Sequence, residues 1–261
     1  MKIIDLTPEY ESLYFLCLED WSDDMKEAGD HKACWYHLMK DKGLKVKLVR
    51  DENGAIVGMI QYLPVEHSFI EGNDLYFVLC IWIHGHKPGV GNCQKKGLGK
   101  ALLIAAEEDV MNTGAKGLAA WGINLPFWMK ASWFRKQGYQ VVDKDGMMRL
   151  LWKPLSPDAV QPSFIKQKKL PPLEPGKVNI SLFLNGWCPA QNLAYERTKR
   201  AIKDFGDKIK LNEFNTIDKD VQKEWGISDA VLINNKHVRN GPPPTYKKIR
   251  RLVEKKVRKI K

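Results

Sequence analysis

A basic segment that contains two glycines, residues 94–100 (QKKGLGK), separates an apolar run from a strongly helix-forming stretch. The run before it, residues 75–83, is aromatic and β-branched, which is typical of a buried strand. The stretch after it, residues 101–110, places its apolar side chains on one face of a helix. Glycines let a backbone approach a ligand closely, and the first amides of a helix have no internal partners. The sequence therefore predicts an anion site suited to a diphosphate. A turn that uses glycine only to reverse direction is the alternative.

At Gln94, Gly97 and Gly99 the sequence resembles the acetyl-CoA loop of the GNAT family of N-acetyltransferases, (Gln/Arg)-x-x-Gly-x-(Gly/Ala). The resemblance covers about residues 1–155. It implies an α/β (α+β) acyl-CoA N-acyltransferase fold with a mixed central sheet. It also implies acetyl-CoA as co-substrate and a primary amine of a small molecule or a protein as acceptor.

The pattern of apolar residues and turn signals in this part predicts alternating strands and helices. Strands are expected over residues 1–6, 45–50, 55–63, 75–83, 117–123 and 147–152, and helices over 10–20, 32–42, 101–110 and 127–136. Residues 22–30 are expected to form an acidic loop, and residues 51–54 a hairpin turn. This order matches the topology of the GNAT family.

The resemblance also implies where the cofactor binds. A splayed central strand would offer backbone amides near residues 81–83 to the pantetheine and the thioester carbonyl, and the loop would hold the diphosphate. The implied cofactor-binding residues are Ile81, Trp82, Ile83, Gln94, Lys95, Lys96, Gly97, Leu98, Gly99, Lys100 and Asn124.

The position at which the family carries its general acid differs in this sequence. Many members carry a Tyr four residues before a Gly-Phe, and here that position is Phe134, with Tyr139 in the place of the Phe. A phenyl ring has no proton to donate. The thiolate would then leave unassisted or take a proton from water or another side chain, or the domain would not catalyse.

Two side chains are candidate general bases. His84 ends the strand face that alternates from Tyr76, near the predicted loop. Glu66, followed by His67, ends the preceding strand. The alternative for each is an ordinary loop or solvated side chain.

Prolines gather between residues 154 and 175, which predicts a semi-extended linker. We therefore expect a GNAT domain over 1–155, a linker over 156–176 and a second domain over 177–261. In the second domain, strands are expected over 178–184, 208–215, 230–233 and 237–238. Helices are expected from after residue 191 to about 205, over 218–225 and at the C-terminal end. This order, with Trp187-Cys188-Pro189 at the first strand–helix junction, resembles a thioredoxin-like, YoaP-like domain.

Cys188 stands where a thioredoxin nucleophile would stand, before a helix N-terminus that lowers a thiol pKa. The position of the resolving cysteine is Gln191, so dithiol exchange within one site is excluded. Cys188 is a candidate reactive thiol, and a structural, substrate-positioning or docking module is the alternative. The cysteines lack paired metal-ligand spacing, so no metal site is expected.

The net charge of +11 suits a polyanionic ligand such as CoA. The basic C-terminal segment carries apolar residues at helical spacing, which favours a docked helix over a nucleic-acid patch. With no membrane-spanning run, no signal-peptide pattern and scattered cysteines, a cytoplasmic protein is expected, and a homodimer is a candidate. The alternative to an acetyltransferase is a non-catalytic acetyl-CoA- or thiol-responsive binding protein.

Overall fold

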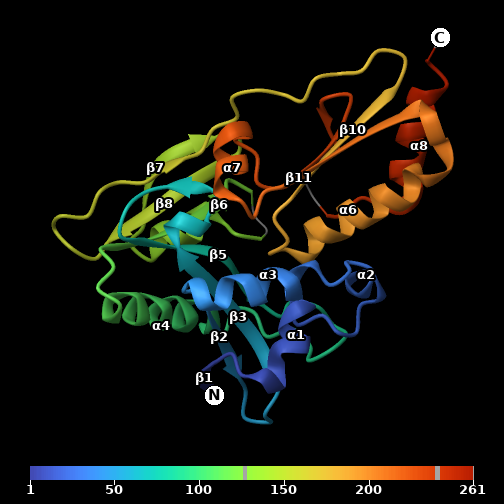
Figure 1. Ribbon diagram of the computed structural model, residues 1–261. Coiled ribbons are helices and arrows are strands. Elements are labelled where there is room, and N and C mark those ends of the chain that lie inside the picture. The colour runs from blue at the N-terminus through green and yellow to red at the C-terminus, as the bar shows by residue number, and fades with distance from the viewer. Residues whose placement is uncertain (126–127, 239–241, 261) are drawn as a thin grey trace. The chain divides into compact units, whose positions relative to one another are not determined.

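The computed structural model describes residues 1–125, 128–238 and 242–260, and the chain divides into two compact units (Figure 1). Unit 1 comprises Met1–Trp21 and His37–Ile165, and unit 2 comprises Ser22–Tyr36 and Lys166–Lys261. The division expected at residues 155 and 176 stays a prediction.

Within the described residues, unit 1 is built on a seven-stranded sheet of order β1-β2-β3-β5-β6-β8-β7 (Figure 1). The strands are β1 (Lys2–Asp5), β2 (Lys45–Arg50), β3 (Ile56–Pro64), β5 (Leu75–Ile83), β6 (Gly117–Ile123), β7 (Gln140–Asp145) and β8 (Met148–Pro154). Neighbouring strands are antiparallel except β5 and β6, which are parallel. The predicted mixed central sheet is therefore confirmed. Two short strands, β4 (Ile70–Glu71) and β9 (Ser163–Phe164), form a separate pair.

Helices lie on both faces of this sheet. Gln61 and Tyr62 are consecutive on β3, so their side chains point to opposite faces. The Tyr62 hydroxyl donates to Asp109 of α4 (Leu98–Asn112), at 2.7 Å. The Gln61 side chain accepts from Tyr14 of α1 (Glu11–Phe15), also at 2.7 Å. The N-terminal segment therefore packs on the sheet face that carries Gln61, and α4 packs on the face that carries Tyr62.

Several elements predicted for the first 155 residues need correction. The helix predicted over 10–20 is wrong in extent, because α1 ends at Phe15 and the next turn has a positive φ at Cys17 and Leu18. The helix predicted over 32–42 is α3 (His31–Met39) followed by a 3-10 turn, η2 (Lys40–Lys42), before Gly43 with φ 89°. The strand β7 was not predicted. The helix predicted over 127–136 is α5 (Ala131–Lys136), and residue 127 lies outside the described residues. Two more 3-10 turns, η1 (Pro8–Tyr10) and η3 (Val65–His67), complete the unit.

Unit 2 has a four-stranded sheet of order β11-β10-β12-β13 in its described part. The strands are β10 (Val178–Leu184), β11 (Ile209–Asn215), β12 (Ala230–Ile233) and β13 (Lys236–His237). The pair β10–β11 is parallel, and the other pairs are antiparallel. The helices are α6 (Pro189–Ile202), α7 (Lys219–Trp225) and α8 (Tyr246–Val257), with a 3-10 segment η4 (Lys203–Lys208). The predicted strands and helices of this part are confirmed to within a few residues.

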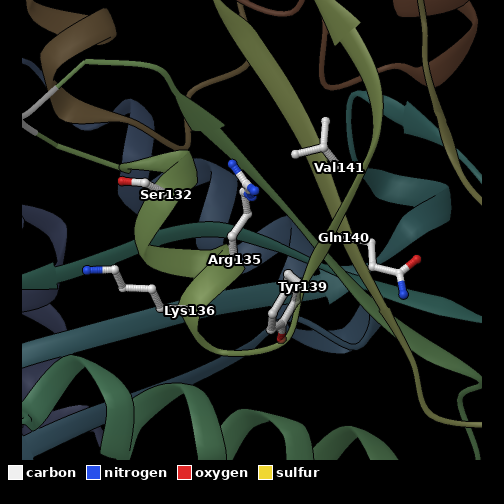
Figure 2. A pocket seen from close by; sticks show the side chains of 6 residues that line it. All are labelled: Ser132, Arg135, Lys136, Tyr139, Gln140 and Val141. Carbon is white, nitrogen blue, oxygen red and sulfur yellow. The ribbon is translucent and has the colours of Figure 1, made fainter.

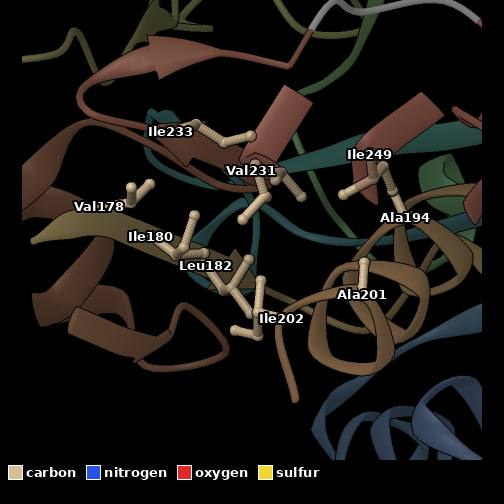
Figure 3. Close-up of a cluster of buried hydrophobic side chains, with 10 residues drawn as sticks. Val178, Ile180, Leu182, Ala194, Ala201, Ile202, Val231, Ile233 and Ile249 are labelled. Carbon is tan, nitrogen blue, oxygen red and sulfur yellow. The ribbon is translucent and has the colours of Figure 1, made fainter. Parts of the chain in front are cut away.

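An apolar cluster joins the sheet of unit 2 to α6 and α8 (Figure 3). The β-strands contribute branched side chains, and the helices contribute small and branched ones. The buried members are Val178, Ile180, Leu182, Ala194, Ala201, Ile202, Val231, Ile233, Ile249 and Val253. Because Ile249 and Val253 face this cluster at helical spacing, the C-terminal helix is docked by its apolar face, as the sequence predicted.

The loop predicted over 22–30 instead contains a short helix, α2 (Asp23–Lys26), whose first turn is capped by Ser22. This segment is bound to α6 by charge. The guanidinium of Arg197, only 6% exposed, lies 2.6 Å from Asp24 and 3.4 Å from Glu27. Arg197 is thus a buried charge whose counter-ions come from a segment some 170 residues earlier.

Removing both counter-ions is expected to destabilise unit 2. The double variant Asp24→Asn, Glu27→Gln leaves the Arg197 guanidinium buried without a carboxylate, which costs about 3 kcal/mol. Adding Arg197→Met should recover most of that loss, since an apolar side chain needs no partner there. Hydrogen exchange of α6 amides measures this change. Equal protection in wild type and the double variant would contradict the expected role of these ion pairs.

Candidate active site

The central feature of unit 1 is a gap between its two parallel strands. β5 pairs with β6 only from Leu75–Gly117 to Val78–Ala120. Beyond that point β5 stays paired with β3 on its other side, and β6 stays paired with β8. A register shift between Gln61 and Tyr62 of β3 accompanies the separation. The facing edges of the two strands are therefore free of strand pairing near Ile81, Trp82 and Ile83, in the part of the sheet that the structure describes.

An aromatic side chain links the two strands where the gap begins. Trp121 of β6 donates its indole N–H to the carbonyl of Leu79 on β5, at 2.8 Å. This bond replaces the strand ladder at the point where the ladder ends. Asn124 is exposed directly after β6, at the same end of the sheet, because the two strands are parallel.

The predicted loop leads into the N-terminus of α4, a helix of 15 residues. Its N-cap is Gly97, with φ 79°, and no side chain caps the first turn. The amides of Leu98, Gly99 and Lys100 have no carbonyl one turn earlier, so they form the positive end of the helix dipole. Lys95, Lys96 and Lys100 are exposed around them. The arrangement concentrates hydrogen-bond donors and positive charge at one helix end.

The side chain of Gln94 fixes this loop to the central strand. Its Nε2 donates to the carbonyl of Ile83, at 3.2 Å, and its backbone amide donates to Asn92 Oδ1, at 3.0 Å. Gly85 lies directly under it, since a Cβ there would stand 2.2 Å from Gln94 Nε2. Gln94 thus links the loop to the end of β5 through its side chain.

The imidazole of His84 is occupied at both nitrogens and fully buried. Its Nδ1 lies 2.7 Å from the carbonyl of Gly91, and its Nε2 lies 3.1 Å from the indole nitrogen of Trp21. A carbonyl only accepts and an indole N–H only donates, so Nδ1 carries the proton and the Nε2 lone pair is used. The geometry therefore argues against His84 as the base: no lone pair remains for an amine.

Glu66 does not share a site with His84. Glu66 is exposed in η3, just beyond Pro64, and Pro64 pairs with Tyr76 near the start of β5. His84 follows Ile83 at the other end of the same strand, roughly 25 Å away at the rise of a strand. The two candidate bases lie at opposite ends of β5, and only the end with His84 adjoins the gap and the loop.

Phe134 is fully buried in α5, with its ring 4.9 Å from Trp133 and 5.6 Å from Tyr139. Tyr139 is a core residue. Its hydroxyl donates to Glu107 at 3.0 Å, and burial raises its pKa well above the usual value. Neither side chain is an exposed acid at the gap.

The hollow drawn in Figure 2 is a different place. It is an open depression between α5 and β7, lined by Ser132, Arg135, Lys136, Tyr139, Gln140 and Val141. Ser132, Arg135 and Lys136 are exposed. None of the residues predicted for cofactor binding or catalysis lines it.

Sequence reasoning missed two residues that stand beside the gap, Glu19 and Trp21, and gave His86 the interpretation of an ordinary loop histidine. The ring of His86 lies 5.3 Å from that of Trp21 and 5.8 Å from that of Trp82. Glu19 Oε1 lies 3.5 Å from His86 Nε2. Only the spacing of His86 two residues after His84, on a run that alternates faces, could have pointed to it.

In unit 2, Cys188 is the N-cap of α6 and is 7% exposed. Pro189 follows at the first helical position. Next to this junction, the Asn185 amide donates to Asp229 at 3.1 Å. The thiol thus lies at a helix N-terminus, as predicted, but below the surface. Its reactivity stays a prediction.

Among the residues that the structure describes, no group of three or more His, Cys, Asp or Glu side chains could hold a metal ion. Within the same residues, no helix combines the length and the apolar character needed to cross a membrane.

Comparison with known proteins adds to this geometry. Residues 5–127 match the model of the Acetyltransferase (GNAT) family. No curated protein matches the chain. Solved structures with a similar course include PaiA N-acetyltransferase from Thermoplasma acidophilum in complex with coenzyme A, at 18% identity and a TM-score of 0.43, covering 59% of this chain and 99% of that one. A GNAT acetyltransferase from Staphylococcus aureus Mu50 is 14% identical, with a TM-score of 0.44 over 59% of this chain and 99% of that one. Residues 5–127 are therefore similar to the Acetyltransferase (GNAT) family.

Proposed function

We propose that unit 1 transfers an acetyl group from acetyl-CoA to a primary amine of a small molecule or a protein. The observation that carries the proposal is the gap between β5 and β6 with the uncapped, basic N-terminus of α4 beside it. An open strand edge and a helix N-terminus are two backbone features that together suit a long ligand with an amide-rich arm and a diphosphate.

In this proposal the diphosphate lies against the amides of residues 97–100, with Lys95, Lys96 and Lys100 around it. The pantetheine runs along the open edge of β5, and backbone amides near Ile81–Ile83 polarise the thioester carbonyl. Gln94 takes a positioning role, since its side chain is bonded to the Ile83 carbonyl. Asn124 stands at the open end of β6 and completes the proposed cofactor site.

The reaction forms a bond between the amine nitrogen and the acetyl carbon and breaks the bond between that carbon and sulfur. The departing thiolate needs a proton, and the buried ring of Phe134 cannot supply one. We assign that proton to water entering the open end of the gap. A thiolate is a stable leaving group compared with an alkoxide, so it depends less on an assisting acid.

For unit 2 we propose a thioredoxin-like accessory module without dithiol exchange. The parallel β10–β11 pair, the antiparallel β12 and β13, and Cys188 at the N-terminus of α6 support the likeness. Gln191 in place of a second cysteine and the burial of Cys188 favour docking or substrate positioning over redox exchange.

Acetyl transfer is tested by incubating the full chain with acetyl-CoA and a panel of primary amines. Free CoA thiol is measured with a thiol reagent, and the acetylated amine by mass spectrometry. We expect stoichiometric release of CoA and acetylated product with at least one amine class. Binding of acetyl-CoA without CoA release from any amine would contradict catalysis and favour the acetyl-CoA-responsive binding protein.

A further inference from the structure

A histidine–carboxylate pair stands beside the gap of unit 1, outside the residues assigned so far. His86 follows β5 by three residues, and its Nε2 lies 3.5 Å from Oε1 of Glu19. The side chain of His86 is 45% exposed, whereas that of Glu19 is 16% exposed. The carboxylate is thus enclosed, while the imidazole is accessible from solvent. A substrate amine can therefore reach the imidazole, and the carboxylate behind it can stabilise the imidazolium.

Indole rings surround the histidine. Those of Trp21 and Trp82 lie 5.3 and 5.8 Å from its ring centre, and that of His84 lies 5.9 Å away. Trp21 is held in place by its hydrogen bond to His84 and by Gly89, where a Cβ would come within 2.5 Å of the Trp21 ring. The buried His84 therefore has a structural role: its hydrogen bond orients the Trp21 ring beside the His86 ring.

One donor of this cluster has no acceptor. The indole nitrogen of Trp82 is buried, and no residue in the described part of the chain accepts from it. The indole nitrogens of Trp35 and Trp152 also have no acceptor among the described residues, so the Trp82 donor supports a site only together with the open strand edge beside it. Trp82 is on β5, beyond Val78, where the pairing with β6 has ended. The unfilled donor and the His86 pair are therefore at the end of the proposed thioester path.

The cluster lies on the sheet face of the N-terminal segment. Trp82 pairs with Met59, and Met59 and Gln61 share a face of β3 because they are two residues apart. Gln61 is bonded to Tyr14 on that face, whereas α4 covers the other. An amine approaching from this side would meet the gap opposite to α4.

We propose that Glu19 and His86 form the proton-accepting pair for the acceptor amine, and that the rings of Trp21 and Trp82 line its subsite. The proposal rests on the function assigned to unit 1 above. His86 is the catalytic residue, and Glu19 is a positioning residue that acts through it.

The step balances in protons and bonds. With the His86 Nε2 proton directed at Glu19, the Nδ1 lone pair takes one proton from the alkylammonium. The neutral amine attacks the acetyl carbon, the C–N bond forms, and the C–S bond breaks with its electron pair on sulfur. The nitrogen loses its second proton to solvent, and the thiolate takes one from water. The imidazolium is stabilised by the Glu19 carboxylate until it returns its proton to solvent.

The environment of Glu19 agrees with this role. Burial raises the pKa of its carboxyl, and the interaction with His86 opposes the rise. Desolvation strengthens the attraction between a carboxylate and the imidazolium beside it. The aromatic faces suit the same acceptor class, since a ring face attracts a cationic amine.

A comparison of two acceptor amines distinguishes a role of His86 in accepting a proton from a role in binding or structure. At pH 7.5 n-butylamine is almost wholly protonated and needs a base, whereas hydroxylamine is mostly neutral and does not. CoA release from acetyl-CoA is measured with each amine, corrected for the reaction without protein, in wild type, His86→Asn and Glu19→Gln. Glu108→Gln and His237→Asn, both on exposed residues, are matched controls. Acetyl-CoA affinity is measured for each variant by calorimetry.

We expect His86→Asn to lower the butylamine rate about 100-fold and the hydroxylamine rate less than threefold. Glu19→Gln should lower the butylamine rate about tenfold with the same selectivity, and the controls should change neither rate. The proposed proton-accepting pair would be contradicted if His86→Asn lowered the rates with both amines equally, or lowered neither rate. It would also be contradicted by a wild type that binds acetyl-CoA but releases no CoA. A wild type that does not bind acetyl-CoA would instead overturn the proposed function itself.

Discussion

The variant Gly97→Trp is expected to bind acetyl-CoA at least 100-fold more weakly than wild type. Gly97 caps α4 with its φ at 79°, and no atom lies within 4 Å of the position a Cβ would take. In the proposed complex that open space is filled by the diphosphate, so an indole there excludes the ligand. A 100-fold loss corresponds to about 2.7 kcal/mol of binding free energy. Calorimetric titration of acetyl-CoA measures it.

A matched control stands at the other end of the same helix. Gly114 follows the C-terminus of α4, has the same φ of 79° and also has no atom within 4 Å of a Cβ. The variant Gly114→Trp therefore carries the same backbone strain without touching the loop. We expect its affinity for acetyl-CoA to stay within twofold of wild type. Equal losses in the two variants would show that strain, not contact, weakens binding, and would contradict the placement of the diphosphate.

The second large effect concerns Asp229 in unit 2. Burial raises the pKa of its carboxyl to about 6, while hydrogen bonds from the Asn185 amide and the Ser228 hydroxyl oppose the rise. The unfolded chain has a pKa near 3.8. Between these values the folded state holds a proton that the unfolded state has lost. The stability contributed by that proton is complete below pH 4 and is lost as the pH rises through about 6.

The variant Asp229→Asn removes this pH dependence. We expect it to be more stable than wild type at pH 7.5 by up to about 3 kcal/mol, from about two units of pKa shift, and equally stable at pH 4. Hydrogen exchange of β10 and β12 follows the stability of unit 2 separately from unit 1. Asp207→Asn, at an exposed position, is the control. A wild type that gains stability in unit 2 between pH 4 and 7, with no gain for Asp229→Asn at pH 7.5, would contradict the raised pKa.

The sequence predicted the central strand, the loop and α4 because their signals are local. Nine apolar and aromatic residues specify β5, and glycines with a helix-forming stretch specify the start of α4. The β5–β6 gap itself depends on a pairing that ends at Val78, which no local pattern encodes. The sequence suggested it only through the resemblance to the GNAT family.

The general base illustrates the limit of periodicity. Alternation puts His84 on the face of Trp82, at the end near the loop. The alternation predicted from Tyr76 is wrong before that point, because the register shift between Gln61 and Tyr62 of β3 places Val78 and Cys80 on opposite faces. It cannot show that Trp21, sixty-three residues earlier in the chain, occupies the Nε2 lone pair of His84. The same distant segment supplies Glu19 to His86. It was predicted as a continuous helix over residues 10–20, and the positive φ at Cys17 and Leu18 broke that helix and set the course of the chain to Glu19.

Segment 22–36 illustrates a second limit. Its acidic residues read as a solvated loop, yet Asp24 and Glu27 neutralise the buried Arg197 of α6. The local sequence is the same whether an acidic residue is solvated on a loop or neutralises a buried guanidinium. Only the tertiary structure separates them.

The proposed function of unit 1 depends most directly on the binding of acetyl-CoA at its loop and gap. The decisive measurement is calorimetric titration of acetyl-CoA into the wild-type chain of 261 residues at low and high salt. We expect saturable one-to-one binding that weakens as salt rises, because the diphosphate is held by amides and by Lys95, Lys96 and Lys100. No heat of binding at either salt concentration would mean that residues 94–100 form only a turn, and it would contradict the proposed function.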